Sequence, residues 1–389
     1  MKKSTRVTHP KPVGLLAGND PVVSPVHHAV KFTYPTIAES LTAEAKEQGF
    51  DYTRDSNPTT RELELTAAAL QDRDDAIATG SGMAAIWLSL LGNLESGDHV
   101  VFFVESYRPN RVAVRRFLPK LGVKFTMLSV HDLAGIERAF AQDDTKLVLF
   151  EAPTNPMLQV PDLEAIVALA KRHEVVTVLD NTFAGLHNHG RYEIDYFVHS
   201  LTKYGNGHGD AMGGIVIADK KRIRAIKPLA TNMGAVLDPG AAFLIARGLK
   251  TYYLRYERHS ENALVIAEFL AQRKEVAKVF YPGLRGDAGH ALASKQMEDF
   301  GGVVTFELNA DEKRAWAFID ALELFTTTAS LGSTESLVCP VKLYLGSDLS
   351  AEERARAQIK DGTVRFAVGI EHVDDLVADI EQALRKTFG

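Results

Sequence analysis

This sequence has little cysteine, no excess of basic over acidic residues and no long apolar segment. It contains a single cysteine, Cys339, so no disulfide can form within the chain and a thiolate metal site would need other ligands. Its formal net charge of −6 argues against a nucleic-acid surface, because such surfaces usually carry a basic excess. No run approaches the roughly 18 apolar residues that a membrane-spanning helix needs. We therefore expect neither a nucleic-acid partner nor a membrane partner.

The N-terminus and the histidines also lack features that would assign them a special role. The basic residues Lys2, Lys3 and Arg6 are not followed by an apolar segment, which predicts a cytoplasmic protein without a secretory signal. His187 and His189 have no acidic or thiol partner nearby, which favours surface or hydrogen-bonded histidines over a metal site. We expect no bound metal.

The 389 residues are too many for one simple core, and the chain divides into three parts. Residues 1–60 are punctuated by prolines and predict an extended N-terminal arm. Residues 61–250 predict a large domain, in which a helix begins near residue 61. Residues 251–389 predict a smaller C-terminal domain.

Short apolar segments alternate with helical ones in the large domain. We expect strands at residues 100–104, 125–130, 146–150, 175–179, 196–198 and 214–218. Almost wholly apolar strands separated by helices, such as residues 163–172, are typical of an α/β fold with a mostly parallel sheet covered on both faces. A long helix with a break near Gly248 is predicted over residues 244–270. Strands at 276–280, 302–307 and 363–368, with helices at 314–322 and 373–386, predict a smaller α+β domain.

Polar residues follow three of the strands in the predicted sheet. Asn155, Asp180 and Lys203 each come shortly after a strand. Ligands of open parallel sheets bind beyond the carboxyl ends of the strands, so we expect these residues to meet at one edge. Each residue also has an ordinary interpretation: an aspartate after a strand often forms a turn, and an isolated lysine usually lies on the surface.

The combination of residues predicts a pyridoxal phosphate site. A lysine nucleophile (Lys203), an acid (Asp180) and hydroxyl groups for a phosphate (Ser200 and Thr202) are what this cofactor requires in one pocket. The glycine-rich segment 79–83 precedes a helix, and such a helix start can bind a phosphate. The segment 205–209 does not match the dinucleotide motif G-x-G-x-x-G, so we do not expect a nicotinamide cofactor.

Eight motifs, spread over most of the chain, resemble those of the fold-type I pyridoxal phosphate enzymes of the cystathionine γ-synthase, cystathionine γ-lyase and methionine γ-lyase family. They are Tyr52-Thr-Arg54-Asp-Ser-Asn-Pro58-Thr59, Ser81-Gly82-Met83-Ala84, Glu151-Ala-Pro-Thr-Asn155-Pro156, Asp180-Asn-Thr182-Phe, His199-Ser200-Leu-Thr202-Lys203-Tyr-Gly-Asn-Gly-His208-Gly-Asp210, Arg247-Gly-Leu-Lys-Thr, Ser330-Leu-Gly-Ser-Thr-Glu335-Ser336-Leu, and Val364-Arg365-Phe-Ala-Val-Gly-Ile-Glu371. The resemblance runs from about residue 21 to residue 384.

The resemblance implies roles for the matching residues. Lys203 resembles the Schiff-base lysine, Asp180 the partner of the pyridine nitrogen, and Tyr107 the tyrosine stacked on the cofactor ring. Tyr52 and Arg54 resemble phosphate contacts that reach in from a neighbouring subunit. We expect Lys203, Tyr107, Asp180 and Tyr52 to take part in catalysis. The resemblance further implies phosphate ligands at Gly82, Met83, Ser200 and Thr202. It implies substrate-carboxylate contacts at Asn155, Ser330 and Arg365, although an arginine in an edge strand could also face solvent.

The family fold implies a large cofactor domain, a small C-terminal domain and a homotetramer built from two dimers with shared active sites. Two segments depart from the family pattern, namely Tyr107-Arg108-Pro109-Asn110 and the continuation 338–345. The first is closer to bacterial cystathionine β-lyases, and in the family both segments lie on the leaving-group side.

We therefore expect a lyase or transferase acting on the γ-substituent of an amino acid, with β-elimination from cystathionine as the alternative. The γ-substituted candidates are cystathionine, methionine, an activated homoserine or an oxygen-linked analogue such as canavanine. A non-catalytic regulator that binds pyridoxal phosphate is a third interpretation. It is disfavoured because no spare basic helical segment is present that could bind DNA.

Overall fold

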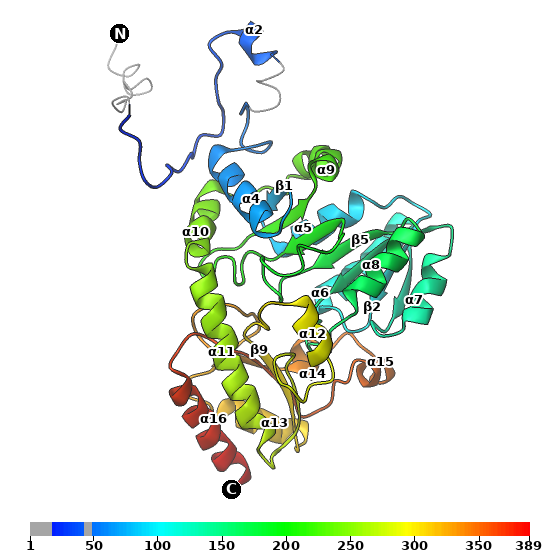
Figure 1. Ribbon diagram of the computed structural model, residues 1–389, viewed down its shortest axis with the longest axis vertical. Coiled ribbons are helices and arrows are strands. Elements are labelled where there is room, and N and C mark those ends of the chain that lie inside the picture. Colours follow the sequence, from blue (N-terminus) through cyan, green and yellow to red (C-terminus); the bar gives the residue numbers. More distant parts are fainter. Residues whose placement is uncertain (1–17, 43–48) are drawn as a thin grey trace.

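The computed structural model describes residues 18–42 and 49–389. In Figure 1 a larger α/β part lies above a smaller part that ends in the C-terminal helix, and the N-terminal segment extends away from both. That segment contains the short helix α2 (Ile37–Ser40) and an isolated bridge between Lys31 and Tyr52. The rest of the predicted arm, residues 1–17 and 43–48, lies outside the described residues.

The larger part is built on a seven-stranded sheet with the order β1-β7-β6-β5-β4-β2-β3. The strands are β1 (Asp75–Thr79), β2 (His99–Phe103), β3 (Lys124–Leu128), β4 (Thr145–Glu151), β5 (Val176–Asp180), β6 (Tyr196–His199) and β7 (Gly214–Ala218). Strands β3, β2, β4, β5 and β6 are parallel, whereas β7 is antiparallel to both β6 and β1. The predicted α/β class and mostly parallel sheet are confirmed.

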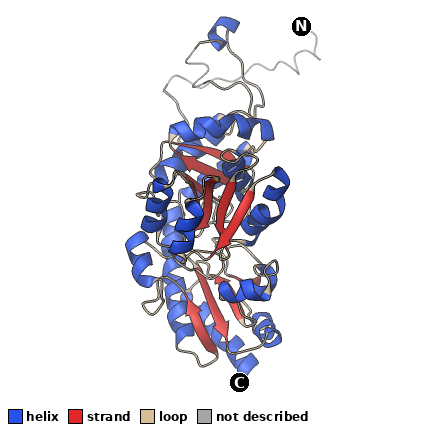
Figure 2. Cartoon of the chain, turned by 90° about the vertical axis from the view of Figure 1, so that its right-hand side faces the viewer, coloured by secondary structure: helices blue, strands red, loops and turns tan. Residues whose placement is uncertain are grey.

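Helices cover both faces of this sheet, as Figures 1 and 2 show. The helices are α4 (Pro58–Leu70), α5 (Gly82–Leu91), α7 (Leu133–Phe140), α8 (Leu163–Arg172), α9 (Lys220–Met233) and α10 (Pro239–Leu249). Two separate apolar clusters result, one with the buried residues of α4, α7, α8 and α10, and one with those of α5 and α9. Helix α8 has the predicted bounds, and the Asp162 carboxylate caps it by accepting a hydrogen bond from Ala165 N.

The predicted long helix is two helices, α10 and α11 (Tyr252–Ala271), with the break just after Gly248. The end of α10 is packed so closely that a Cβ added to Gly248 would lie 2.1 Å from the Asn206 carbonyl oxygen. Arg255 donates to the carbonyls of Gly248 and Tyr204, which ties the start of α11 to the segment that follows Lys203.

The smaller part has a five-stranded sheet with the order β10-β11-β12-β9-β8. Its strands are β8 (Val276–Phe280), β9 (Val303–Leu308), β10 (Thr326–Thr327), β11 (Leu337–Pro340) and β12 (Thr363–Ala367). Helices α11, α13 (Glu312–Asp320) and α16 (Val373–Phe388) pack against it in one apolar cluster. The domain boundary near residue 250 stays a prediction.

The remaining elements are short. They are α6 (Arg108–Val112), the π-helical turn η1 (Ala113–Phe117), the 3-10 turn η2 (Leu118–Leu121), α12 (His290–Gln296), α14 (Val341–Tyr344) and α15 (Ala351–Arg356). Within the described residues, none of the helices has the length and apolarity to cross a membrane.

Three buried histidines, His189, His199 and His259, and the half-buried His187 have strongly lowered pKa values, and burial is the main cause in each. The pKa falls to about 3 for His189 and His199, and to about 4 for His187 and His259. His199 Nε2 lies 2.7 Å from Gln71 Oε1, and His189 Nδ1 lies 2.7 Å from Asn181 Oδ1. These neutral rings are therefore hydrogen-bonded parts of the interior, as the sequence favoured for His187 and His189.

We expect acid to destabilise the protein through these histidines. Each has a lower pKa folded than unfolded, so its contribution is complete above the unfolded value of about 6.5 and is lost as the pH falls towards 4. Between its folded and unfolded pKa, each histidine contributes about 1.4 kcal/mol per pH unit to the slope of the free energy of unfolding against pH. Urea unfolding at several pH values between about 4.5 and 7.5 measures this slope. His199→Gln should reduce the slope, whereas His131→Gln, at an exposed position, should not. Equal slopes in all three proteins would contradict this.

Candidate functional site

A cavity of about 470 Å³ lies at the carboxyl ends of β4, β5 and β6, where residues of the smaller part also reach it. The predicted residues that line it are Gly82, Met83, Tyr107, Asn155, Asp180, Ser200, Thr202, Lys203, Ser330 and Arg365. The structure thus brings together ten of the twelve residues that the sequence singled out. Their chemical roles stay predictions.

Lys203 is largely buried in this cavity. Its Nζ donates a hydrogen bond to Ser330 Oγ at 2.6 Å. Burial and the nearby Arg365 lower the pKa of Lys203 to about 8, although the negative charge of Asp180 opposes them. A substantial fraction of the amine is then neutral near physiological pH, as a nucleophile or base requires.

Asp180 is the last residue of β5, and its carboxylate is buried. Oδ1 accepts a hydrogen bond from the Thr182 hydroxyl at 2.6 Å, and Oδ2 accepts one from Asn110 Nδ2 at 3.2 Å. Burial raises the pKa of Asp180, while these hydrogen bonds and Lys203 lower it. A buried carboxylate that faces a cavity is suited to a protonated nitrogen of a bound group.

A second buried acid, Glu151, lies beside Asp180 and was not assigned a role from the sequence. The two residues are partners in the register of β4 and β5, and Asn110 Nδ2 donates to both. The Glu151 carboxylate also accepts from the backbone N–H groups of Tyr107 and Asn155. Burial and the charge of Asp180 raise the pKa of Glu151 to about 8. The available signal was its place at the end of a buried strand.

The start of α5 forms the side of the cavity suited to a phosphate. The Ser81 hydroxyl caps this helix by accepting from Ala84 N. A Cβ added to Gly82 would lie 2.8 Å from Ser200 Cβ, so only glycine fits here. Thr202 also lines this region, and the helix N-terminus adds backbone N–H groups and positive potential.

Arg365 in β12 is buried, with 3% of its surface exposed, so it does not face solvent. Nη1 donates to Asn155 Oδ1 at 3.0 Å, and Nη2 donates to the Ser330 carbonyl at 2.9 Å. Its Nε has no hydrogen-bond partner among the described residues. Ser330 has a φ of 121°, a strained conformation for a residue other than glycine. Through these two hydrogen bonds the Arg365 side chain links the larger and smaller parts of the chain, and its Nε–H is free to bind a ligand.

Tyr52 and Arg54 do not line the cavity of their own chain. Both are exposed, and the Arg54 guanidinium lies 5.2 Å from the centre of the Tyr52 ring. Within the described residues, Arg54 forms no ion pair with Asp51 or Asp55. The expected contact with a neighbouring subunit stays a prediction. Among residues 18–42 and 49–389, no group of three or more His, Cys, Asp or Glu side chains could hold a metal ion.

These residues fit pyridoxal phosphate. Lys203 supplies an amine, Asp180 a buried carboxylate, and the Gly82 turn a place where backbone groups can approach a phosphate closely. Tyr107 supplies an aromatic ring at the same cavity. A single pocket therefore contains the chemical groups that the cofactor requires.

Comparisons with known proteins agree with this fit. Residues 16–385 match the family described as Cys/Met metabolism PLP-dependent enzyme. The L-methionine γ-lyase of Fusobacterium nucleatum subsp. polymorphum is 40% identical over 346 residues, which cover 88% of this chain and 87% of that protein. The cystathionine β-lyase of Lactococcus lactis subsp. cremoris is 39% identical over 340 residues, covering 87% and 89%.

A solved structure with the same fold is the cystathionine γ-synthase of Xanthomonas oryzae pv. oryzae in complex with cystathionine. It is 35% identical, and the TM-score is 0.89 over 94% of this chain and 93% of that one. The similar proteins thus bear the names of three different reactions. The fold is that of the fold-type I pyridoxal phosphate enzymes, as the sequence predicted.

We expect the amine of Lys203 in the cofactor-free protein to titrate near pH 8. Trace labelling with acetic anhydride from pH 6 to pH 10, followed by peptide mass spectrometry, measures this pKa. Arg365→Gln removes a nearby positive charge and should raise the pKa, whereas Asp180→Asn removes a negative charge and should lower it further. Arg116→Gln, an exposed change outside the cavity, is the control. Shifts of the same sign in the first two variants would contradict this electrostatic assignment.

Proposed function

Because the chain belongs to the Cys/Met metabolism PLP-dependent enzyme family, we propose that it eliminates or replaces the γ-substituent of an amino acid. The candidate substrates are cystathionine, methionine, an activated homoserine and an oxygen-linked analogue such as canavanine. The observation that carries the proposal is the convergence of the Lys203 amine, the buried Asp180 carboxylate and the Arg365 guanidinium on one cavity. Asp180 ends a strand of the large sheet, Lys203 lies in the loop after β6, and Arg365 lies in the smaller sheet. Together they suit an α-amino acid bound to the cofactor, with Arg365 facing its carboxylate.

Bound pyridoxal phosphate supplies an electron sink that stabilises negative charge at the substrate α-carbon. Lys203 holds the cofactor before substrate binds and then acts as the base that removes the α-proton. Its lowered pKa supports this role, because a fraction of the amine is neutral near pH 7. γ-Chemistry requires the loss of a second proton, from the β-carbon, and Lys203 is the base that we assign to it. Asp180 keeps the pyridine nitrogen protonated through its buried carboxylate.

Arg365, Asn155 and Ser330 bind the substrate α-carboxylate in this proposal. The Arg365 guanidinium is held by Asn155 and by the Ser330 carbonyl, which fixes the plane of its fork. Burial and the charge of Asp180 raise the pKa of Tyr107, so its phenol stays protonated and can donate to a leaving group. Gly82, Met83, Ser200 and Thr202 hold the cofactor phosphate.

We further propose a homotetramer, a dimer of dimers in which Tyr52 and Arg54 complete the active site of a neighbouring subunit. Several apolar side chains of the N-terminal segment are exposed in the single chain, notably Val22, Val30 and Ile37. Apolar surface of this kind is typical of a segment that packs on another protein surface. In a dimer, Arg54 could then form charge-assisted hydrogen bonds with a phosphate.

β-Elimination from cystathionine is the second candidate function. The segment Tyr107-Arg-Pro-Asn110 favours it, because it resembles the bacterial β-lyase pattern at the start of α6. The likeness to the Lactococcus enzyme points the same way. The two candidates differ in product: γ-elimination from an unbranched amino acid releases 2-oxobutanoate, whereas β-elimination releases pyruvate.

A substrate screen tests the proposed function. The holoenzyme is incubated with cystathionine, methionine, canavanine and two homoserine esters, with and without cysteine, and the products are identified by mass spectrometry. We expect turnover of at least one γ-substituted amino acid, and a loss of several orders of magnitude in Lys203→Ala. Borohydride reduction should place the pyridoxyl group on Lys203. Pyruvate as the sole keto product would favour the β-lyase alternative, and labelling of another lysine would refute the assignment.

Subunit mixing tests the shared site. Arg54→Ala and Lys203→Ala chains, each of which we expect to be inactive alone, are combined under conditions that allow subunit exchange. If sites are shared, a hybrid dimer has one site with both defects and one intact site, so activity should approach a quarter of the wild-type value after random mixing. If each chain builds its own site, every site keeps a defect. No recovery, with hybrids confirmed by native mass spectrometry, would rule out sharing.

A further inference from the structure

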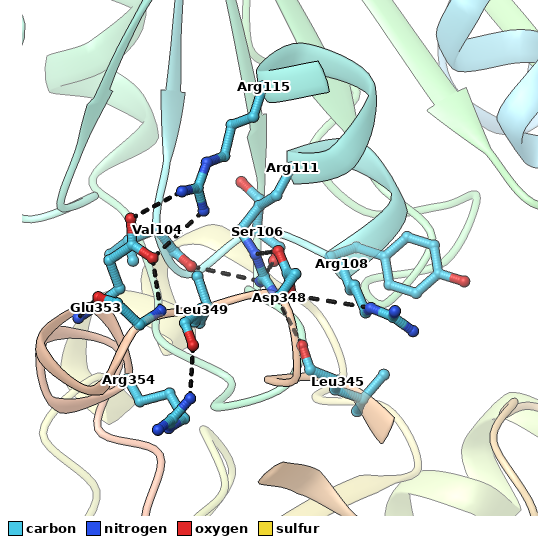
Figure 3. A network of polar contacts seen from close by, with 12 residues as sticks. Val104, Ser106, Arg108, Arg111, Arg115, Leu345, Asp348, Leu349, Glu353 and Arg354 are labelled. Atoms are coloured by element: carbon cyan, nitrogen blue, oxygen red, sulfur yellow. Dashed lines mark hydrogen bonds and ion pairs between the residues drawn. The ribbon is translucent and has the colours of Figure 1, made fainter. Parts of the chain in front are cut away.

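One wall of the cavity comes from a segment that departs from the family pattern. Tyr344 and Leu345, at the end of α14, line the cavity together with Arg108 and Pro109 at the start of α6. Because α6 and α14 belong to different parts of the chain, the width of the cavity here depends on what holds them together. Figure 3 shows the polar network that does so.

Arg111 lies at the centre of this network, and its side chain has no exposed surface. Its Nε and Nη2 donate to the two carboxylate oxygens of Asp348, at 3.0 and 2.7 Å. Nη2 also donates to the Leu345 carbonyl at 2.6 Å, and Nη1 donates to the carbonyls of Val104 and Ser106. The guanidinium therefore binds the turn after β2 to the loop 345–348 with nearly all of its donor capacity.

Arg108 lies one helical turn earlier and behaves differently. Its Nε is 3.9 Å from Asp348 Oδ1, and 46% of its side chain is exposed. Since Arg111 already forks onto Asp348, that carboxylate does not hold Arg108 closely. Arg108 therefore remains a cation at the cavity wall.

A second ion pair lies farther out in the same network. Arg115 in η1 pairs with Glu353 in α15 at 3.2 Å, and both side chains are partly exposed. Exposed pairs of this kind contribute little to stability, whereas removal of one partner from a buried forked pair has a large effect. The inner pair should therefore hold the wall, and the outer pair provides a matched control.

We propose that Arg111 is a positioning residue for leaving-group selectivity: through Asp348 and the Leu345 carbonyl it fixes the segment 341–349 as the wall against the substrate's leaving group. This inference rests on the proposed function. Arg111 itself does not line the cavity and touches no reacting atom. Without its fork, Asp348 would be left buried and would draw Arg108 out of the cavity wall, so both the shape and the charge of the wall would change.

The test compares substrates that differ only in the leaving group, O-acetyl-L-homoserine and O-succinyl-L-homoserine, in the wild type and in Arg111→Lys. Lysine keeps the charge and loses the fork. We expect the ratio of the two kcat/KM values to change at least fivefold, mainly through KM, while the absorbance spectrum of the bound cofactor stays the same. Arg115→Gln should leave the ratio within twofold. Equal proportional losses of kcat/KM for the two esters, which leave the ratio unchanged, would overturn the proposal.

Two further measurements cover the possibilities that Arg111→Lys does not fold and that neither ester reacts. In Arg111→Met/Asp348→Leu no charge is left unpaired in the interior, so the fold should survive. The ratio of the two kcat/KM values should still differ at least fivefold from the wild type, because the side chain at position 111 then no longer ties the Leu345 carbonyl to α6. Hydrogen exchange in the peptide 341–349 should be at least tenfold faster in either Arg111 variant than in Arg115→Gln. Unchanged exchange would overturn the proposal even if no substrate were known. A wild type that converts none of the screened amino acids would instead refute the proposed function.

Discussion

The buried carboxylate of Asp180 is the constraint around which the site is arranged. A charge removed from water is tolerated only where hydrogen bonds or opposite charges compensate it. Asn110 and Thr182 supply the hydrogen bonds, and Lys203 supplies positive charge nearby. The strand register places Glu151 directly beside Asp180, and two adjacent carboxylates resist ionising together. Burial of the Glu151 carboxylate, together with this neighbouring charge, raises its pKa to about 8.

The cavity also depends on how the two sheets meet. Lys203 follows a strand of the large sheet, whereas Ser330 and Arg365 come from the smaller part, and hydrogen bonds join them across the cavity. The Thr305 hydroxyl donates to the Pro156 carbonyl at 2.6 Å and adds another link between the two parts. A change in the relative position of the sheets would therefore alter the substrate side of the site before it altered the cofactor side.

The strands that the sequence predicted well are rich in branched and aromatic apolar residues. Strands β7 and β8 have the predicted bounds, and β2 and β5 agree within about one residue. Strand β1 was not predicted, because Asp-Ala-Ile-Ala-Thr is poor in the branched and aromatic residues that favour strands. Its extended conformation comes from pairing all five residues with β7, a partner about 140 positions later in the chain. Strand β11 was also missed, because it is only four residues long and ends in a proline.

The sequence by itself determined the fold class, most strands of the large sheet and the central chemical groups. Apolar periodicity and the residues that follow each strand are local features, and they are enough to single out Asp180 and Lys203. Only the tertiary structure decided which distant side chains meet. Asn110 reaches Asp180 across 70 positions, and Arg111 reaches Asp348 across 237. No local spacing encodes such contacts, because they depend on how whole layers pack. The same packing buries Glu151 and gives an ordinary strand-end acid a raised pKa.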